Sequence, residues 1–306
     1  MDHSAGSFPA EVFFLVPALA ASAAYVAGAC SAKARGWSKH RTAMFVLGIA
    51  FAVSTVLGPL PALARGNFAV LALTHVVAGM LAPLLLVLAR PVTLALRSMD
   101  RIPALRTVRI LRSPPARILA SPLTAAALNL GGMYLMFRTP LYDAMRTHAP
   151  VHWIVTFHLV AAGYLWTAAL IGRDPNPHRA GLRLRAGILV LTAAAHNILA
   201  KSLFAQPPAG VPADQAEAGA MAMYYAGGAV EIAVMIVLCH QWYRNPAQRP
   251  SAPAVSGHGT VPAHSTATGK APDSRKAPPA GGQEGPFTPA SGAGTGGSGV
   301  REQGPA

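Results

Sequence analysis

The sequence has little charge, almost no cysteine and no recognisable catalytic motif. Only 12% of its 306 residues are Asp, Glu, Lys or Arg, about half the share of a soluble globular protein, so a soluble domain is not expected. Its two cysteines, Cys30 and Cys239, exclude a disulfide framework and a cysteine-rich metal site. No catalytic triad, P-loop, dinucleotide-binding fingerprint or CxxC motif occurs, and the sequence therefore predicts a protein that is not an enzyme.

Apolar residues are abundant instead. They make up 52% of the chain, and the mean hydropathy is +0.38. Runs of about 20 apolar residues can cross a hydrocarbon core about 30 Å thick, and they must do so as helices, because lipid cannot pair an open sheet edge. The sequence predicts an all-α polytopic membrane protein with seven transmembrane helices, at about 11–30, 42–64, 67–89, 118–137, 150–172, 186–205 and 219–242.

Positive charge predicts the orientation of these spans. The chain has 25 Lys and Arg against 11 Asp and Glu, a formal net charge of +14. The basic residues lie between apolar runs, which indicates a membrane topology signal and no nucleic-acid partner. Of the 25, 21 lie on one side of the predicted membrane and three on the other. The positive-inside rule then places the N-terminus outside and the C-terminus in the cytoplasm.

The composition divides the chain into two parts. Residues 1–244 form the predicted seven-helix transmembrane domain. Residues 245–306 contain no Leu or Ile, one aromatic residue (Phe287) and 22 Pro or Gly among 62 residues. Such a segment cannot bury enough apolar surface to offset the entropy of ordering, so we expect a disordered Pro/Gly-rich cytoplasmic tail.

The predicted cytoplasmic loop 90–117 is the most basic segment of the chain. Arg106, Arg109 and Arg112 recur at every third residue, and an aliphatic residue directly precedes each of them. This spacing is typical of a short amphipathic helix that lies on anionic lipid headgroups. The alternative is that these arginines serve only as topology signals.

Three histidines lie inside predicted spans at a common depth. His75, His158 and His196 each fall roughly 12–14 Å below the outer boundary, at 1.5 Å per helical residue. Ionisable residues within a membrane are functional candidates, and neutral imidazoles suit copper or zinc. The sequence therefore predicts a metal site, with copper as the candidate ion, formed by His75, His158 and His196 and open to the outer face. The alternative is that each histidine hydrogen-bonds a neighbouring helix.

Two further charged residues lie in the last two predicted spans. Helical side chains lean toward the N-terminus of their own helix, so Lys201 and Glu231 lean toward each other from antiparallel spans. We expect a buried Lys201–Glu231 pair. The alternative is that Lys201 extends alone to the outer interface.

Three segments resemble a known family. They are THVVAGMLAPLLLVLARPVTLALR from Thr74, TPLYDAMRTHAPVHWIVTFHLVAAGYLWTAALIGRDPNPHR from Thr139, and MYYAGGAVE from Met223. Together they resemble the CtaG-like family of bacterial cytochrome c oxidase assembly factors, over residues 40–243. His75, His152, His158 and the turn 172–175 match family positions. Many members carry a second histidine one turn before His75, and Leu71 stands there in this chain.

The resemblance implies a function and a location. It implies a non-enzymatic role in the maturation of a heme–copper cytochrome c oxidase, with oxidase subunits as partners, assistance at its copper centres, and a multi-pass location in a bacterial plasma membrane. A membrane transporter for copper or a small solute is the alternative. Its path would be lined by His75, His158, His196, Lys201 and Glu231. A visible inverted repeat would favour transport, and the sequence shows none.

Overall fold

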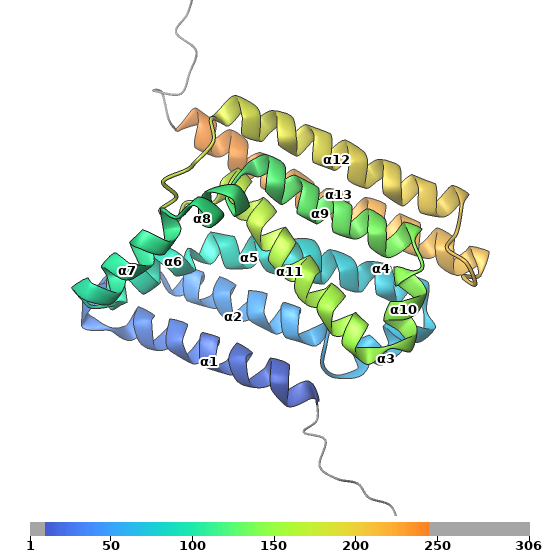
Figure 1. Cartoon of the computed structure of the whole chain (residues 1–306), viewed down its shortest axis with the longest axis horizontal. Helices are drawn as coiled ribbons and strands as arrows, with labels where there is room; N and C mark the ends of the chain where they lie inside the picture. The colour runs from blue at the N-terminus through green and yellow to red at the C-terminus, as the bar shows by residue number, and fades with distance from the viewer. Residues whose placement is uncertain (1–9, 245–306) are drawn as a thin grey trace, which may run out of the picture. The chain divides into compact units, whose positions relative to one another are not determined.

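The computed structural model describes residues 10–244, and the predicted tail lies outside that range. Every regular element in the described range is helical, which confirms the all-α class (Figure 1). The elements are α1 (Ala10–Cys30), η1 (Ala32–Ala34), α2 (Lys39–Ser54), α3 (Pro59–Gly66), α4 (Phe68–Val76), η2 (Val77–Leu81), α5 (Ala82–Ala89), α6 (Pro91–Ser98), α7 (Arg101–Leu111), α8 (Pro114–Leu119), α9 (Pro122–Arg138), α10 (Leu141–Thr147), α11 (Ala149–Ile171), α12 (Leu182–Ala205) and α13 (Ala213–Tyr243).

Four helical stretches in the described range are long and apolar enough to cross a membrane. They are Phe68–Ser98, Ala149–Ile171, Leu182–Ala205 and Ala213–Tyr243. Helices α2 and α3 form a fifth if the pair, bent by 47°, counts as one span. The apolar part of α1, Phe14–Cys30, is shorter. The protein is therefore a membrane-helix protein, and the count of seven spans stays a prediction.

The outward faces of these helices are apolar. Ile154 and Phe157 on α11 are 69% and 68% exposed, and Ile198 on α12 and Ile236 on α13 are each 63% exposed. Exposed apolar side chains on this scale would be unfavourable against water. They fit helices that face lipid on one side and pack against each other on the other side.

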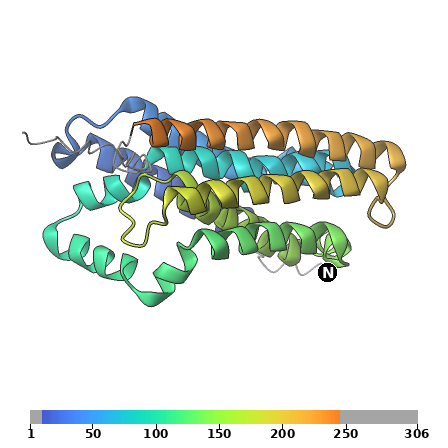
Figure 2. The same cartoon turned by 90° about the horizontal axis from the view of Figure 1, so that it is seen from above.

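The long helices of the described range pack side by side as a bundle. Helix α13 lies against α4 and α12, α11 lies against α9, η2 and α5, and α2 lies against α5 (Figures 1 and 2). Helix α1 is held through Tyr25, which stacks on Phe45 with ring centroids 4.0 Å apart and donates a hydrogen bond of 2.7 Å to the Ala89 carbonyl. The central helix formed by α4, η2 and α5 therefore contacts most of the other long helices.

That central helix contains a π-helical turn, η2. Pro83 has no backbone N–H, so it cannot donate to the carbonyl of Gly79 four residues earlier. The wider turn at Val77–Leu81 accommodates this missing bond. Gly163 of α11 packs directly on the Gly79 carbonyl: a Cβ at position 163 would lie 2.0 Å from that oxygen. The two glycines thus allow α11 to approach the central helix closely.

The central helix ends where the sequence reads Arg90-Pro91. Arg90 adopts a left-handed conformation with φ of 55°, and α6 begins at Pro91, a favoured first helical residue. The carboxylate of Asp174 caps α6, accepting hydrogen bonds from the Thr93 amide at 2.8 Å and the Thr93 hydroxyl at 2.5 Å. The turn at 172–175, quoted above for its resemblance, thus holds the start of α6.

The basic loop 97–117 contains two short helices, α7 and α8 (Figure 2). Apolar side chains of α7 are exposed, with Ile102 at 65% and Ile110 at 68%. Asp100 forms an ion pair of 2.5 Å with Lys33 from the loop after α1. The 31–41 and 97–117 loops therefore lie at the same end of the bundle.

Candidate buried histidine site

Three long helices bring ionisable side chains to one buried place. His75 comes from α4, His196 from α12 and Glu231 from α13, and the three side chains belong to residues that are only 4%, 3% and 5% exposed. A buried charge is stable only with a partner. The arrangement therefore depends on which of these groups contact each other.

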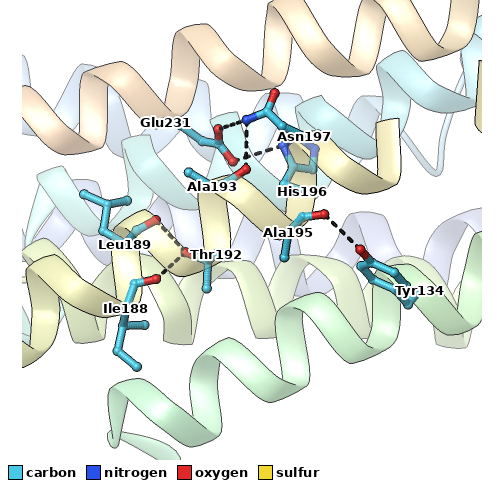
Figure 3. A network of polar contacts seen from close by, with 9 residues as sticks. All are labelled: Tyr134, Ile188, Leu189, Thr192, Ala193, Ala195, His196, Asn197 and Glu231. Carbon is cyan, nitrogen blue, oxygen red and sulfur yellow. Dashed lines mark hydrogen bonds and ion pairs between the residues drawn. The ribbon is translucent and has the colours of Figure 1, made fainter. Parts of the chain in front are cut away.

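His196 and Glu231 form a direct pair (Figure 3). The imidazole Nδ1 lies 3.0 Å from the carboxylate Oε1. Asn197 donates from its side-chain nitrogen to the other carboxylate oxygen at 3.3 Å and to the Ala193 carbonyl at 2.8 Å. Both oxygens of Glu231 are thus engaged by α12. The contact lies in buried surroundings of low dielectric constant, where a polar interaction is stronger than at a surface.

Gly227 makes room for this pair. A Cβ at that position would lie 2.4 Å from Cε1 of His196 and 3.2 Å from its Nε2. Gly227 lies one helical turn before Glu231, so both residues face α12 from the same side of α13. The small residue receives the imidazole ring, and the carboxylate fixes its orientation.

His75 lies beside this pair and differs from it. Its ring centroid is 6.3 Å from that of His196 and 5.8 Å from that of Phe137, whose ring meets it edge-on. Neither of its ring nitrogens has a hydrogen-bond partner. A neutral imidazole carries one donor and one acceptor, so both are left unpaired in the interior.

A small cavity lies against His75. Its volume is about 20 Å³, which is room for one water molecule or one ion. His152, from the first turn of α11, also lines it; the Nε2 of His152 is unpaired, and its ring contacts the backbone of Thr55. Met136 of α9 and Met145 of α10 also line it. We refer to the space lined by His75, His152, Met136 and Met145 as the histidine chamber.

The three histidines predicted to share a metal site are not all together. His75 and His196 are neighbours, whereas His158 lies on another face of α11. Its Nε2 donates to the Leu128 carbonyl of α9 at 3.1 Å, and the ring packs on Gly132, where a Cβ would lie 2.3 Å from that nitrogen. Within residues 10–244, no three His, Cys, Asp or Glu side chains are grouped to hold a metal ion.

The expected Lys201–Glu231 pair is wrong. Glu231 pairs with His196 and Asn197, as described above, because these side chains lie at its own level on α12. Lys201 is exposed, and its ammonium group lies 5.4 Å from the centroid of the Tyr224 ring. It therefore makes a cation–π contact near the end of α12. This position resembles the alternative stated for Lys201, in which it extends toward the outer interface without a carboxylate partner.

Sequence reasoning missed the residues that complete the chamber. The role of His152 was suggested only by its match to a family position, and methionines within apolar runs give no signal of their own. The Gly227–Glu231 spacing was a usable signal, because a small residue one turn from an acid marks a face where a neighbouring helix comes close.

A comparison with protein-family profiles identifies a family. The sequence profile described as "Cytochrome c oxidase caa3 assembly factor (Caa3_CtaG)" matches residues 23–245. Uncharacterized proteins of Mycobacterium bovis and Mycobacterium tuberculosis are each 33% identical to the chain over 174 residues, covering 54% of this chain and 26% of their own length. One from Mycobacterium leprae is 28% identical over 247 residues, covering 72% of this chain.

This chain is similar to only part of those relatives, since it spans 26% to 37% of their length. No solved structure matches it significantly. The family match, in contrast, covers well over half of the 306 residues. The chain therefore belongs to the cytochrome c oxidase caa3 assembly factor family.

Proposed function

We propose that this protein is a membrane assembly factor that assists the maturation of the copper centres of a heme–copper cytochrome c oxidase in a bacterial plasma membrane, without catalysing a reaction itself. Family membership supports oxidase assembly. The histidine chamber supports the assignment to copper, because a space of ionic size is lined by two histidines with unpaired ring nitrogens and by two methionines, residue types that bind copper. That chamber is the observation that carries the proposal.

The proposal includes seven spans with the N-terminus outside. The excess of arginine and lysine in the loops that include 31–41 and 97–117 supports it, as does the Lys33–Asp100 pair between those two loops. The chamber lies toward the opposite end, since Met145 of α10 and Thr55 at the end of α2 line it. It would then be close to the outer face. In the proposed orientation, α7 and α8 lie on anionic headgroups at the inner face.

The metal site remains a proposal with a changed geometry. His75 keeps its place in it, because both of its ring nitrogens are free of protein partners. His196 is not a ligand in this geometry; it lies beside His75 and pairs with Glu231. His158 is not a ligand either, and its contact with Leu128 joins α9 and α11. Oxidase subunits are the expected partners, and exposed lipid-facing helices are the surface available to them.

Deleting the gene tests the proposal. We expect loss of cytochrome c oxidase activity and of copper in the isolated oxidase, with unchanged total cellular copper, and recovery with the wild-type gene. A variant with Gly187→Ala serves as a matched control for expression, because a Cβ there meets no atom within 4 Å. Normal oxidase copper together with altered cellular copper would instead indicate the transporter.

A further inference from the structure

We infer that the histidine chamber binds a single Cu(I) ion through the imidazole nitrogens of His75 and His152 and the thioether sulfurs of Met136 and Met145. The inference rests on the proposed function only for the destination of the ion. The unpaired nitrogens, the donor types, and the charge and size of the space support binding itself.

The unpaired nitrogens are the first observation. His75 and His152 are 4% and 7% exposed, and three of their four ring nitrogens have no partner. Buried polar atoms in proteins are nearly always paired, because an unpaired one loses its hydration without compensation. A ligand in the chamber would satisfy these atoms. His158, by contrast, has a protein partner, since its Nε2 donates a hydrogen bond to the Leu128 carbonyl of α9.

The donor types select the ion. Thioether sulfur is a soft donor that favours Cu(I), whereas zinc is usually held by thiolate, imidazole and carboxylate. Met136 and Met145 are 1% and 3% exposed, so water does not compete at their sulfurs. Met133, one turn before Met136 on α9, is equally buried at 2% but does not line the chamber. The two methionines in the chamber are therefore distinguishable from an ordinary core methionine.

The charge of the space favours a monovalent ion. No carboxylate or thiolate lines the chamber. A divalent ion held by four neutral ligands would keep its full double charge in a medium of low dielectric constant, which is far more costly than a single charge. The Glu231 side chain contacts His196, whose ring centroid lies 6.3 Å from that of His75, so it does not line the chamber itself.

The test is a titration of the full-length protein in detergent, under reducing and anaerobic conditions, with Cu(I) in competition with a chromophoric Cu(I) chelator. We expect one Cu(I) per chain. His75→Ala, His152→Ala and the double variant Met136→Leu/Met145→Leu should each weaken binding at least tenfold, as loss of a ligand usually does. X-ray absorption of the loaded wild type should show sulfur scattering that the double Leu variant lacks.

The controls are matched to the ligands. His158→Ala and Met133→Leu remove a histidine and a methionine from the same two helices without touching the chamber, and should bind as the wild type does. The Met→Leu changes conserve volume, so they keep the test decisive even if a His→Ala variant fails to fold. Absence of Cu(I) binding in folded wild type, or equal weakening in the control variants, overturns the inference and leaves a buried water as the occupant.

This outcome is separable from the function proposed above. If the wild type binds no Cu(I) but deletion of the gene still abolishes the oxidase, the site is refuted and the assembly role stands. If Cu(I) binds as expected but the deletion strain assembles a normal oxidase, the assembly role is refuted and the site stands.

A second inference comes from the other end of the bundle. A cavity of about 380 Å³ lies between α2, α5, α11 and α13, lined by His40, Arg41, Arg90, Arg173 and His240 above apolar side chains. No carboxylate lines it. Arg41 lies 4.8 Å from the centroid of the Trp37 ring. Arg90 is partly buried and lies within the influence of the positive charges of Arg41 and Arg173 and of the negative charge of Asp174. We propose that this cavity binds a phosphate group, since clustered cations with apolar walls suit a phospholipid head with its chains.

Native mass spectrometry of the detergent-solubilised protein tests this second site. With added cardiolipin we expect a retained lipid that Arg41→Gln/Arg173→Gln loses, whereas Arg65→Gln in α3, which does not line the cavity, keeps it. Retention of inorganic phosphate but not cardiolipin would identify a free anion as the ligand. Equal retention of cardiolipin and phosphatidylcholine, unaffected by the double variant, would refute the site.

Discussion

Replacing Gly163 with alanine should separate α11 from the central helix. The new Cβ would lie 2.0 Å from the Gly79 carbonyl oxygen, 2.9 Å from its carbon and 3.0 Å from Cγ of Pro83. An ordinary contact is about 3.4 Å, so the helices must move apart by about 1.4 Å. Two of the three atoms belong to the backbone of η2, and no change of rotamer can relieve the contact.

The magnitude follows from two opposing effects. Alanine in a helix interior is favoured over glycine by about 1 kcal/mol. Overpacking a well-packed interior costs about 1–3 kcal/mol, and a contact with a backbone carbonyl belongs at the upper end. We therefore expect Gly163→Ala to lower the free energy of unfolding by about 2 kcal/mol.

Reversible unfolding in mixed detergent micelles, followed by circular dichroism, measures this change. Gly187→Ala on α12 is the control, because no atom lies within 4 Å of its Cβ, and it should be neutral or slightly stabilising. Gly163 lies on the same helix as His152, and Gly79 lies one turn after His75, so the variant should also weaken Cu(I) binding. Wild-type stability in Gly163→Ala would refute the close approach and, with it, the shape of the chamber.

Three further outcomes follow from the contacts. Gly227→Ala should lower the free energy of unfolding by about 2 kcal/mol, because its Cβ meets a buried imidazole of α12, whereas Gly228→Ala meets nothing within 4 Å and should not. Asp174→Ala should cost about 2 kcal/mol by removing the charged cap of α6, measured by the same unfolding. The Lys33 ammonium lowers the pKa of Asp100 through a hydrogen bond and its charge; the stabilisation is present above the ordinary carboxyl pKa and is lost as the pH falls through the lowered one. Lys33→Ala should therefore raise the Asp100 pKa measured by NMR.

The helical fold was predictable because lipid leaves few choices. Apolar runs at 67–89, 150–172, 186–205 and 219–242 each became part of a long apolar helix. The structure adds to the first of these a separate helix, α6, which begins directly after Arg90 and is capped by Asp174, so that the apolar stretch runs to Ser98. Asp174 lies 81 positions from Thr93 in the sequence, so no local sequence pattern predicts this contact.

For the candidate site, the sequence predicted the level of a histidine along its helix but not the direction in which its side chain points. Position along a helix fixes the level of a side chain, and His75 and His196 are indeed neighbours. The direction in which a residue faces depends on packing, and His158 faces α9 because Gly132 leaves room for its ring. Packing likewise explains why Glu231 contacts His196 and not Lys201, because Gly227 leaves room for the His196 ring beside it.

These contacts distinguish the three predicted histidines by what satisfies them. His158 and His196 each pack on a glycine of a neighbouring helix and have one ring nitrogen beside an oxygen, from Leu128 and Glu231, whereas Nε2 of His196 has no partner. Each of the two rings therefore has at least one oxygen contact within the protein. His75 is equally buried and has no partner on either nitrogen, although it faces a cavity that His152 also lines. Since an unpaired buried imidazole is costly, the place for a ligand is next to His75, where the protein leaves the pairing incomplete.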